Sequence, residues 1–207
     1  MKRVILSFIF TIITVTLYGQ TENSNLKMSS EGIESNELLE ILRFEGINYF
    51  KIKFTGDNEF KNKGYSIRAQ EFIDGHLTLD TLIINTKSIG VPRLETINDT
   101  ILNISVVAKQ TFENKLKLMF NFSGFSTARE FELIETEDSY SLRNLAEESG
   151  LPIKCDESFY LLAYILPYDL GNGFKSYCEV GKNGTDAENW GMKFGIKHYL
   201  LFEMKIE

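Results

Sequence analysis

The sequence predicts a mainly β protein, an antiparallel β-sandwich or partly closed barrel with one or two short helices. Three observations predict it. Apolar and polar residues alternate with a period of two along much of the chain, turn-forming residues separate these runs, and strand-like segments do not alternate with helix-like ones. A strand with this alternation buries one face and keeps the other in water, which is typical of antiparallel sheets.

Four segments carry the alternation most clearly. Their apolar positions are Phe50, Ile52 and Phe54; Leu102, Ile104, Val106 and Ala108; Leu116, Leu118, Phe120 and Phe122; and Leu200, Phe202, Met204 and Ile206, which follow His198 to the end of the chain. A fifth segment, from Ser158 to Tyr168, is almost continuously apolar. We expect it to be a central strand that is covered on both faces.

A β-hairpin is predicted around Asp74 and Gly75. The strand-like runs Tyr65 to Ile73 and His76 to Asn85 flank this pair. Asp-Gly is favoured in two-residue type I′ turns because both central positions need a positive φ. The pair therefore predicts a tight turn between two antiparallel strands.

The register of this hairpin follows from the turn. A two-residue turn without irregularity would place Ile67 opposite Leu82. In that register, however, each face of the hairpin holds apolar residues over only part of its length, so the apolar side changes partway along both runs. We therefore expect a bulge near Gln70 or Asp80, or a hairpin that is buried on both faces.

Three segments have helical features. Glu37 to Arg43 could be a short helix that begins at Asn36, or the first strand of the sheet. Ser141 to Ser149 is expected to be a helix, because its apolar residues share one side and Gly150-Leu151-Pro152 would end it. Thr185 lies three residues before a glutamate, a capping-box spacing that predicts a second, shorter helix.

The N-terminus has the anatomy of a secretory signal peptide. Lys2 and Arg3 form a basic head, and Val4 to Tyr18 is an apolar stretch without acidic residues. Cleavage is expected between Gly19 and Gln20, because a small residue precedes that junction. The alternative is an uncleaved membrane anchor, but the stretch is shorter than the ~20 apolar residues that span a bilayer.

The predicted cleavage divides the chain into three parts. Residues 1–19 are the signal peptide, residues 20–36 are a flexible lead, and residues 37–207 are a single β-rich domain. The lead is expected to be flexible because it contains no aromatic residue and no hydrophobic period. The expected location is that of an exported bacterial protein in the periplasm, on the cell surface or in the medium, with no transmembrane segment after cleavage.

The chain contains two cysteines, Cys155 and Cys178. In an oxidising compartment they are expected to form one disulfide, which would stabilise the fold by about 3 kcal/mol on the chain-entropy model. The alternative is a pair of free buried thiols, as expected if the chain is not exported.

The charge of the chain excludes one class of partner. The formal net charge is −7, and removal of the predicted signal peptide makes it more negative, because that segment holds two basic residues and no acidic ones. Nucleic acid is not an expected partner, since phosphate binding requires a basic surface. No cofactor is expected either, because the sequence has neither a GxGxxG nor a Walker-type motif.

Residues with metal-binding or catalytic chemistry are sparse. His76 and His198 are the two histidines, and neither has another His or Cys at ligand spacing, so no metal site is predicted and no catalytic residue is assigned. Residues 169–173 contain oxygen ligands but lack the spacing of a calcium loop. A run of five acidic residues is interpreted as a solvated strand edge. It consists of Glu130, Glu132, Glu135, Glu137 and Asp138.

The candidates for a binding surface are aromatic. They are Tyr160, Tyr164, Tyr168, Tyr177 and Trp190. Flat rings with polar tips can stack on a sugar or a peptide, but the preferred interpretation is that these rings fill the core and rim of the sandwich. On one uninterrupted strand the first three point to the same face, so only a bulge could divide them.

These features favour a non-enzymatic exported protein, a binding or envelope-associated β-domain whose ligand is a protein or a glycan. One alternative is a secreted hydrolase acting on glycans, with its carboxylates drawn from different strands. Another is an inhibitor or immunity-like protein whose acidic surface binds a basic partner.

Overall fold

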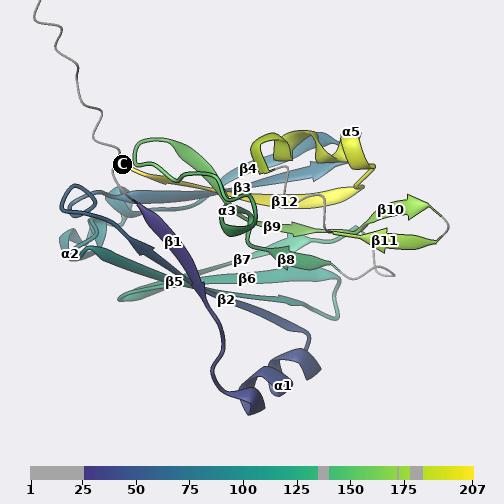
Figure 1. Cartoon of the computed structure of the whole chain (residues 1–207), viewed down its shortest axis with the longest axis horizontal. Helices are drawn as coiled ribbons and strands as arrows, with labels where there is room; N and C mark the ends of the chain where they lie inside the picture. The colour runs from purple at the N-terminus through teal and green to yellow at the C-terminus, as the bar shows by residue number, and fades with distance from the viewer. Residues whose placement is uncertain (1–25, 135–139, 172, 178–183) are drawn as a thin grey trace, which may run out of the picture.

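The computed structural model describes residues 26–134, 140–171, 173–177 and 184–207. Within them the strands form two five-stranded antiparallel sheets and one two-stranded ribbon. The two sheets lie one above the other as the layers of a β-sandwich (Figure 1). The predicted fold class is confirmed.

The two sheets contain distant parts of the chain. The first has the order β1-β2-β5-β6-β7, with β1 Lys27–Glu31, β2 Ile47–Thr55, β5 Ile101–Gln110, β6 Lys115–Phe122 and β7 Phe125–Glu132. The second has the order β4-β3-β12-β9-β8, with β4 His76–Asn85, β3 Tyr65–Ile73, β12 His198–Ile206, β9 Ser158–Ile165 and β8 Ser141–Arg143. The ribbon pairs β10 Tyr168–Gly171 with β11 Phe174–Ser176. The predicted strands of the hairpin and the alternating segments are present. The apolar strand predicted from Ser158 to Tyr168 ends at Ile165, and Tyr168 begins the ribbon instead.

The core lies between the sheets and is rich in aromatic rings. Phe202 of β12 meets Phe120 of β6 edge to face, with ring centroids 5.8 Å apart. Phe131 of β7 approaches the same ring at 6.1 Å. Each such pair adds attraction beyond its buried area. The central strand β12 is buried on both faces, because Tyr199 on its outer face packs against Trp190.

The predicted hairpin turn is confirmed. Asp74 and Gly75 both have positive φ, +50° and +79°. Ile67 pairs with Ile84 rather than with Leu82, so the uninterrupted register does not hold and the bulge expected near Gln70 or Asp80 is confirmed. The register shifts twice, between Ile67 and Arg68 and between Glu71 and Phe72, so β4 carries extra residues on both sides of Asp80. These bulges explain why the apolar face changes sides.

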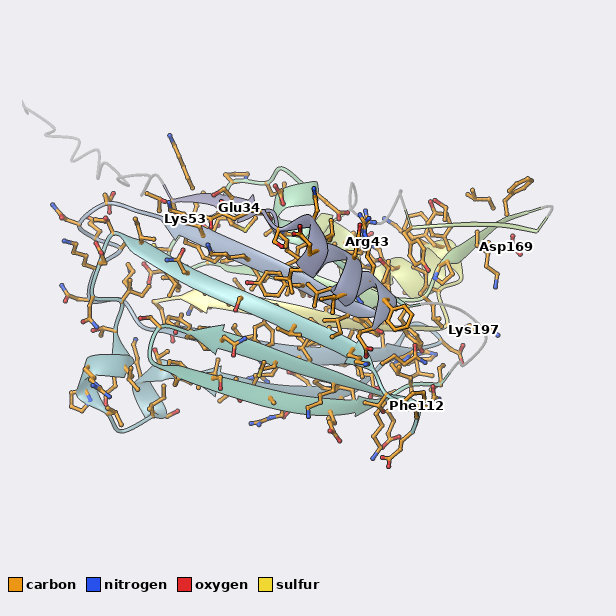
Figure 2. All side chains as sticks on the ribbon, turned by 90° about the horizontal axis from the view of Figure 1, so that it is seen from below. Glu34, Arg43, Lys53, Phe112, Asp169 and Lys197 are labelled. Atoms are coloured by element: carbon orange, nitrogen blue, oxygen red, sulfur yellow. The ribbon has the colours of Figure 1, made fainter. Side chains whose placement is uncertain are left out.

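The helices are short. They are α1 Asn36–Phe44, η1 Thr86–Ser88, α2 Pro92–Glu95, α3 Leu145–Glu148, η2 Gly184–Asn189 and α5 Trp190–Phe194. The segment from Glu37 to Arg43 was predicted to be either a helix that begins at Asn36 or a strand. It is the helix α1, which begins at Asn36 and has Ser35 as its N-cap. None of its side chains is buried, and Figure 2 shows it in front of the first sheet, with Arg43 on it. No helix among the described residues has the length and apolar character needed to cross a membrane.

The helix predicted over Ser141 to Ser149 is wrong in its first half. Those residues form the edge strand β8, and the helix α3 begins only after Asn144. The Asn144 side chain accepts a hydrogen bond from the backbone N–H of Glu147, which is the role of a helix cap rather than of an interior residue. The helix expected near Thr185 is present as η2 followed by α5.

Part of the predicted flexible lead is a strand of the first sheet. β1 pairs with β2 along its length, and Leu26 is buried and forms a bridge with Ile153. An edge strand is held by backbone hydrogen bonds, so it needs no apolar period. The flexible-lead prediction is therefore wrong for residues 26–31. The predicted signal peptide and residues 20–25 lie outside the described residues.

Candidate functional site

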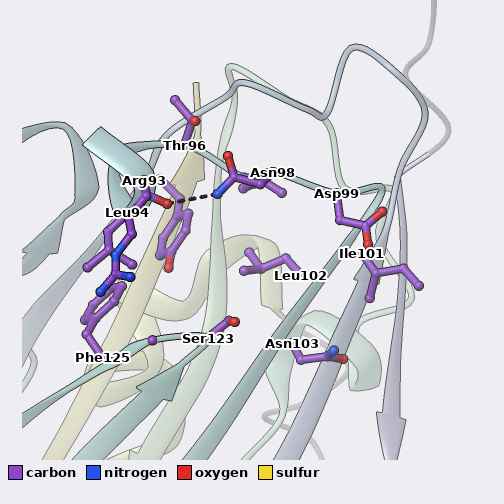
Figure 3. A pocket seen from close by; sticks show the side chains of 13 residues that line it. Arg93, Leu94, Thr96, Asn98, Asp99, Ile101, Leu102, Asn103, Ser123 and Phe125 are labelled. Carbon is purple, nitrogen blue, oxygen red and sulfur yellow. Dashed lines mark hydrogen bonds between the residues drawn. The ribbon is translucent and has the colours of Figure 1, made fainter. Parts of the chain in front are cut away.

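A depression of about 560 Å³ opens at one end of the sandwich. Three segments surround it: α2 with the loop that follows, the start of β5, and the turn between β6 and β7. Figure 3 shows Arg93 and Phe125 on one side, Asp99 and Asn103 on the other, and Asn98 between them. Its polar lining side chains are Arg93, Thr96, Asn98, Asp99, Asn103 and Ser123.

Backbone hydrogen bonds hold the loop that forms one wall. The buried Ile97 donates its N–H to the Lys63 carbonyl and accepts from the Asn62 N–H, both at 2.9 Å. The Asn98 side-chain amide donates to the Arg93 carbonyl at 2.9 Å, which closes the loop on α2 (Figure 3). Asp99 accepts the Thr100 N–H at 2.7 Å. A loop fixed in this way loses little further entropy when a ligand binds.

The turn between β6 and β7 forms a second wall, next to α2. Gly124 has a φ of +95°, which glycine adopts without strain. A Cβ at this position would lie 3.1 Å from Leu94 Cδ2. The absence of a side chain therefore lets this turn lie close to α2.

The aromatic rings of Tyr65 and Phe125 line the depression. Tyr65 is 5% exposed and packs 5.3 Å from Phe122, on which the half-buried Phe125 stacks at 4.7 Å. Burial raises the pKa of Tyr65, so its hydroxyl stays protonated and can both donate and accept. Within the described residues no hydrogen bond to that hydroxyl is formed, whereas every polar side-chain atom shut off from solvent has a partner. The hydroxyl is therefore open to the depression that Tyr65 lines.

The aromatic candidates from the sequence are not brought together as an open platform. Tyr164, Tyr168 and Trp190 are buried in the core. Tyr160 and Tyr177 are half-buried and pack against it. None of the five aromatic candidates lines the depression at the end of the sandwich. The residues that do line this depression form no sequence motif, so no signal in the sequence indicated the site.

A bulge in β9 divides the tyrosines of that strand. Tyr164 pairs with Leu200 of β12, and the pairing shifts between Phe202 and Glu203, so that Tyr160 pairs with Glu203. Tyr164 therefore points into the sandwich, where it stacks on Tyr140 at 5.1 Å. Tyr160 points to the outer face.

The two histidines have different surroundings. His76 is exposed beside the hairpin turn, whereas His198 is fully buried. His198 Nδ1 lies 2.7 Å from the Tyr140 hydroxyl, and Nε2 lies 3.1 Å from a carboxylate oxygen of Glu71. Burial lowers the pKa of His198, and Glu71 opposes this shift in part. A neutral ring satisfies both contacts if Nε2–H donates to Glu71 and Nδ1 accepts from Tyr140.

Sequence reasoning missed this buried chain of three side chains. The signal that could have found it is the alternation of β12, since His198 shares the inward-facing positions of Leu200 and Phe202. Among the described residues, no group of three or more His, Cys, Asp and Glu side chains could hold a metal ion.

The acidic run and the loop near residue 169 have ordinary surface positions. Glu130 and Glu132 are exposed on the edge strand β7, as predicted, while Glu135, Glu137 and Asp138 lie outside the described residues. Asp169 lies on the ribbon that extends from the body (Figure 2) and accepts the Gly171 N–H at 2.7 Å. This hydrogen bond is local to a turn.

The predicted disulfide falls only partly within the structure. Cys155 is half-buried and packs against the core. Cys178 lies outside the described residues, so the pairing of the two stays a prediction.

Comparisons of the chain with family models, curated proteins and solved structures found no match. Function is therefore inferred from the residues of the depression and their geometry.

Proposed function

We propose that this chain is an exported, non-enzymatic binding domain whose ligand is a glycan held in the depression at the end of the sandwich. One observation carries the proposal: six polar side chains and the aromatic rings of Tyr65 and Phe125 line the same depression. Sugar hydroxyls need donors and acceptors in several directions, and the apolar faces of a sugar ring pack on aromatic side chains.

The charges of the lining favour a neutral or weakly charged ligand. Arg93 and Asp99 are its two formally charged residues. The side-chain amides of Asn98 and Asn103 and the hydroxyl of Tyr65 offer uncharged donors and acceptors. A hydroxylated ligand matches this mixture better than a phosphate or a polycation would, because those groups are bound by clusters of opposite charge.

Binding is favoured over hydrolysis of the same glycan. Glycosidases use two carboxyl groups, which lie about 5 to 10 Å apart across the scissile bond. The described lining of this depression supplies one carboxylate, Asp99, and its Oδ1 already accepts the Thr100 N–H.

Export is the second part of the proposal. It is supported by the basic pair Lys2 and Arg3 and by the apolar stretch from Val4 to Tyr18. Intact-mass measurement of the protein recovered outside the inner membrane of a bacterial host is expected to show a chain that begins at Gln20. A chain that retains Met1 in that fraction would contradict it.

The ligand can be identified with a panel of soluble oligosaccharides and polysaccharides, followed by calorimetry on any that bind. Arg93→Ala and Asn103→Ala are expected to weaken binding about tenfold each, the loss expected when one or two hydrogen bonds are removed. Lys117→Ala is the matched control, since Lys117 is exposed on β6 away from the depression. Equal affinity in all three variants would refute the assigned site, and release of reducing ends would favour a hydrolase.

A further inference from the structure

A second depression, of about 430 Å³, lies at the edge of the second sheet. It is lined by residues of α3, of the segment between Ser149 and Ser158, and of β9 and β12. Glu188 of η2 lines it as well. This depression shares no lining residue with the one assigned to the glycan.

One wall of the second depression is apolar. Leu145 and Ala146 of α3 contribute buried side chains, and Ile153 is buried beside them. Pro152 and the half-buried Phe159 extend the wall. Such a surface can cover the methylene groups of a long side chain of a ligand while the polar end of that side chain lies beyond the apolar wall.

The opposite wall carries Tyr160 and two carboxylates. The Tyr160 hydroxyl donates to Glu188 Oε1 at 2.6 Å, and Tyr160 pairs across the strands with the half-buried Glu203. Burial, and then the hydrogen bond to Glu188, raise the pKa of Tyr160, so the phenol keeps its proton. The hydroxyl fixes one oxygen of Glu188, and the remaining carboxylate oxygens can accept from a ligand.

The cations near these carboxylates are engaged elsewhere. Lys154 pairs with Glu157 at the rim, at 3.1 Å. Arg68 is the register neighbour of Glu203 on β3, but its guanidinium donates to Asp80 at 3.0 and 2.8 Å. Neither Glu188 nor Glu203 has an ion pair within the described part of the chain. Of the three carboxylates that line the depression, Glu157 is paired with Lys154, and the exposed Glu188 and the half-buried Glu203 are left to accept hydrogen bonds from a cationic ligand.

We propose that this depression binds a cation carried on an aliphatic stem, namely the ammonium or guanidinium group of a lysine or arginine side chain or of a free alkyl amine or guanidine. The apolar wall covers the stem, and Glu188 and Glu203 accept hydrogen bonds from the charged group. Charge-assisted hydrogen bonds of this kind are stronger than those between neutral groups. The site does not depend on the glycan proposal, because the two depressions are separate.

Calorimetry at low salt on the full-length mature protein tests this site. The ligands are agmatine, a blocked Gly-Arg-Gly peptide and the same peptide with citrulline in place of arginine. Binding of both cations indicates that the head group and stem suffice, whereas binding of the peptide alone indicates a protein partner. The citrulline peptide is expected to bind at least about tenfold more weakly, because it has the shape of arginine without the charge.

The variants Glu203→Gln and Glu188→Gln are expected to weaken binding of the cation about tenfold each. Glu130→Gln is the matched control, because Glu130 is an exposed carboxylate on β7. All three keep the size of the side chain, and a circular dichroism spectrum verifies that each is folded. No binding of either cation, equal binding of the citrulline peptide, or full affinity in the Glu188 and Glu203 double variant would overturn the proposal.

Discussion

The Tyr140 hydroxyl lies 2.7 Å from Nδ1 of His198, a side chain with no exposure to solvent. The two rings meet nearly perpendicular, at 84°. Together with Glu71 they form a satisfied polar chain inside an otherwise apolar core. Such a chain stabilises one arrangement of the strands, because any other packing would leave a buried polar group without a partner.

The first prediction concerns that hydrogen bond. Tyr140→Phe removes the hydroxyl and leaves Nδ1 of His198 without its partner, so the free energy of unfolding is expected to fall by about 1 to 3 kcal/mol. Tyr49→Phe, at a half-buried position on β2, is the control and is expected to change it much less. Denaturant titration measures the free energy of unfolding of both variants. Equal stability of the two would show that the hydrogen-bonded chain of Tyr140, His198 and Glu71 contributes little to the stability of the fold.

The second prediction concerns pH. The pKa of His198 is lowered from 6.5 in the folded protein, so the unfolded chain binds this proton more readily. The free energy of unfolding is therefore expected to decrease as the pH falls below about 6.5, with a slope of at most about 1.4 kcal/mol per pH unit from this one group.

Titration of stability between pH 7.5 and 5 in the wild type, in His198→Gln and in His76→Ala tests this assignment. The slope should be smaller in His198→Gln and unchanged in His76→Ala, because His76 is exposed. A wild-type slope that persists in His198→Gln would place the titrating group elsewhere.

The third prediction separates backbone strain from packing at the hairpin. Gly75 and Gly150 both have positive φ, +79° and +63°, but a Cβ at Gly75 would lie 3.2 Å from Met192 Cγ, whereas nothing lies within 4 Å of one at Gly150. Gly150→Ala is expected to cost about 1 kcal/mol from strain alone, and Gly75→Ala to cost more. Equal losses in thermal or denaturant unfolding would mean that α5 moves away from the turn at no cost.

The fourth prediction is the disulfide between Cys155 and Cys178. A thiol count under denaturing, non-reducing conditions on the exported protein should find no free thiol. The bond is expected because the compartment of an exported protein is oxidising. The α-carbons of a bonded pair must lie about 4.4 to 6.8 Å apart. Two titratable thiols in exported protein would refute the bond.

The sequence predicted the β-sandwich because the residues that fill its core, such as Phe120 and Phe202, recur with a period of two on their strands. The hairpin was predictable for a local reason as well, since Asp74 and Gly75 specify the turn. The change of apolar face predicted a bulge near Gln70 or Asp80, but it did not give the number of bulges or their positions, because each bulge depends on which side chains the opposite sheet can accept.

The errors have physical causes. β1 has no apolar period because an edge strand is held by its backbone, and the segment from Ser141 forms β8 because it pairs with β9 before Asn144 can cap a helix. The depression was not predictable, because tertiary structure alone brings Arg93, Asn103 and Phe125 together. Tyr160 was named from its residue type, but its carboxylate partners depend on the bulge in β9.

The most direct test of the central claim is to map the bound glycan by NMR. Titration of an ¹⁵N-labelled mature protein with a glycan from the panel is expected to shift the amide resonances of residues 93–99, 101–103 and 123–125, with shifts that saturate at the calorimetric affinity. Residues of α1, remote from the depression, serve as the internal control and should remain unchanged. Saturating shifts confined to any other part of the sandwich, or no glycan that shifts these three segments, would contradict the account.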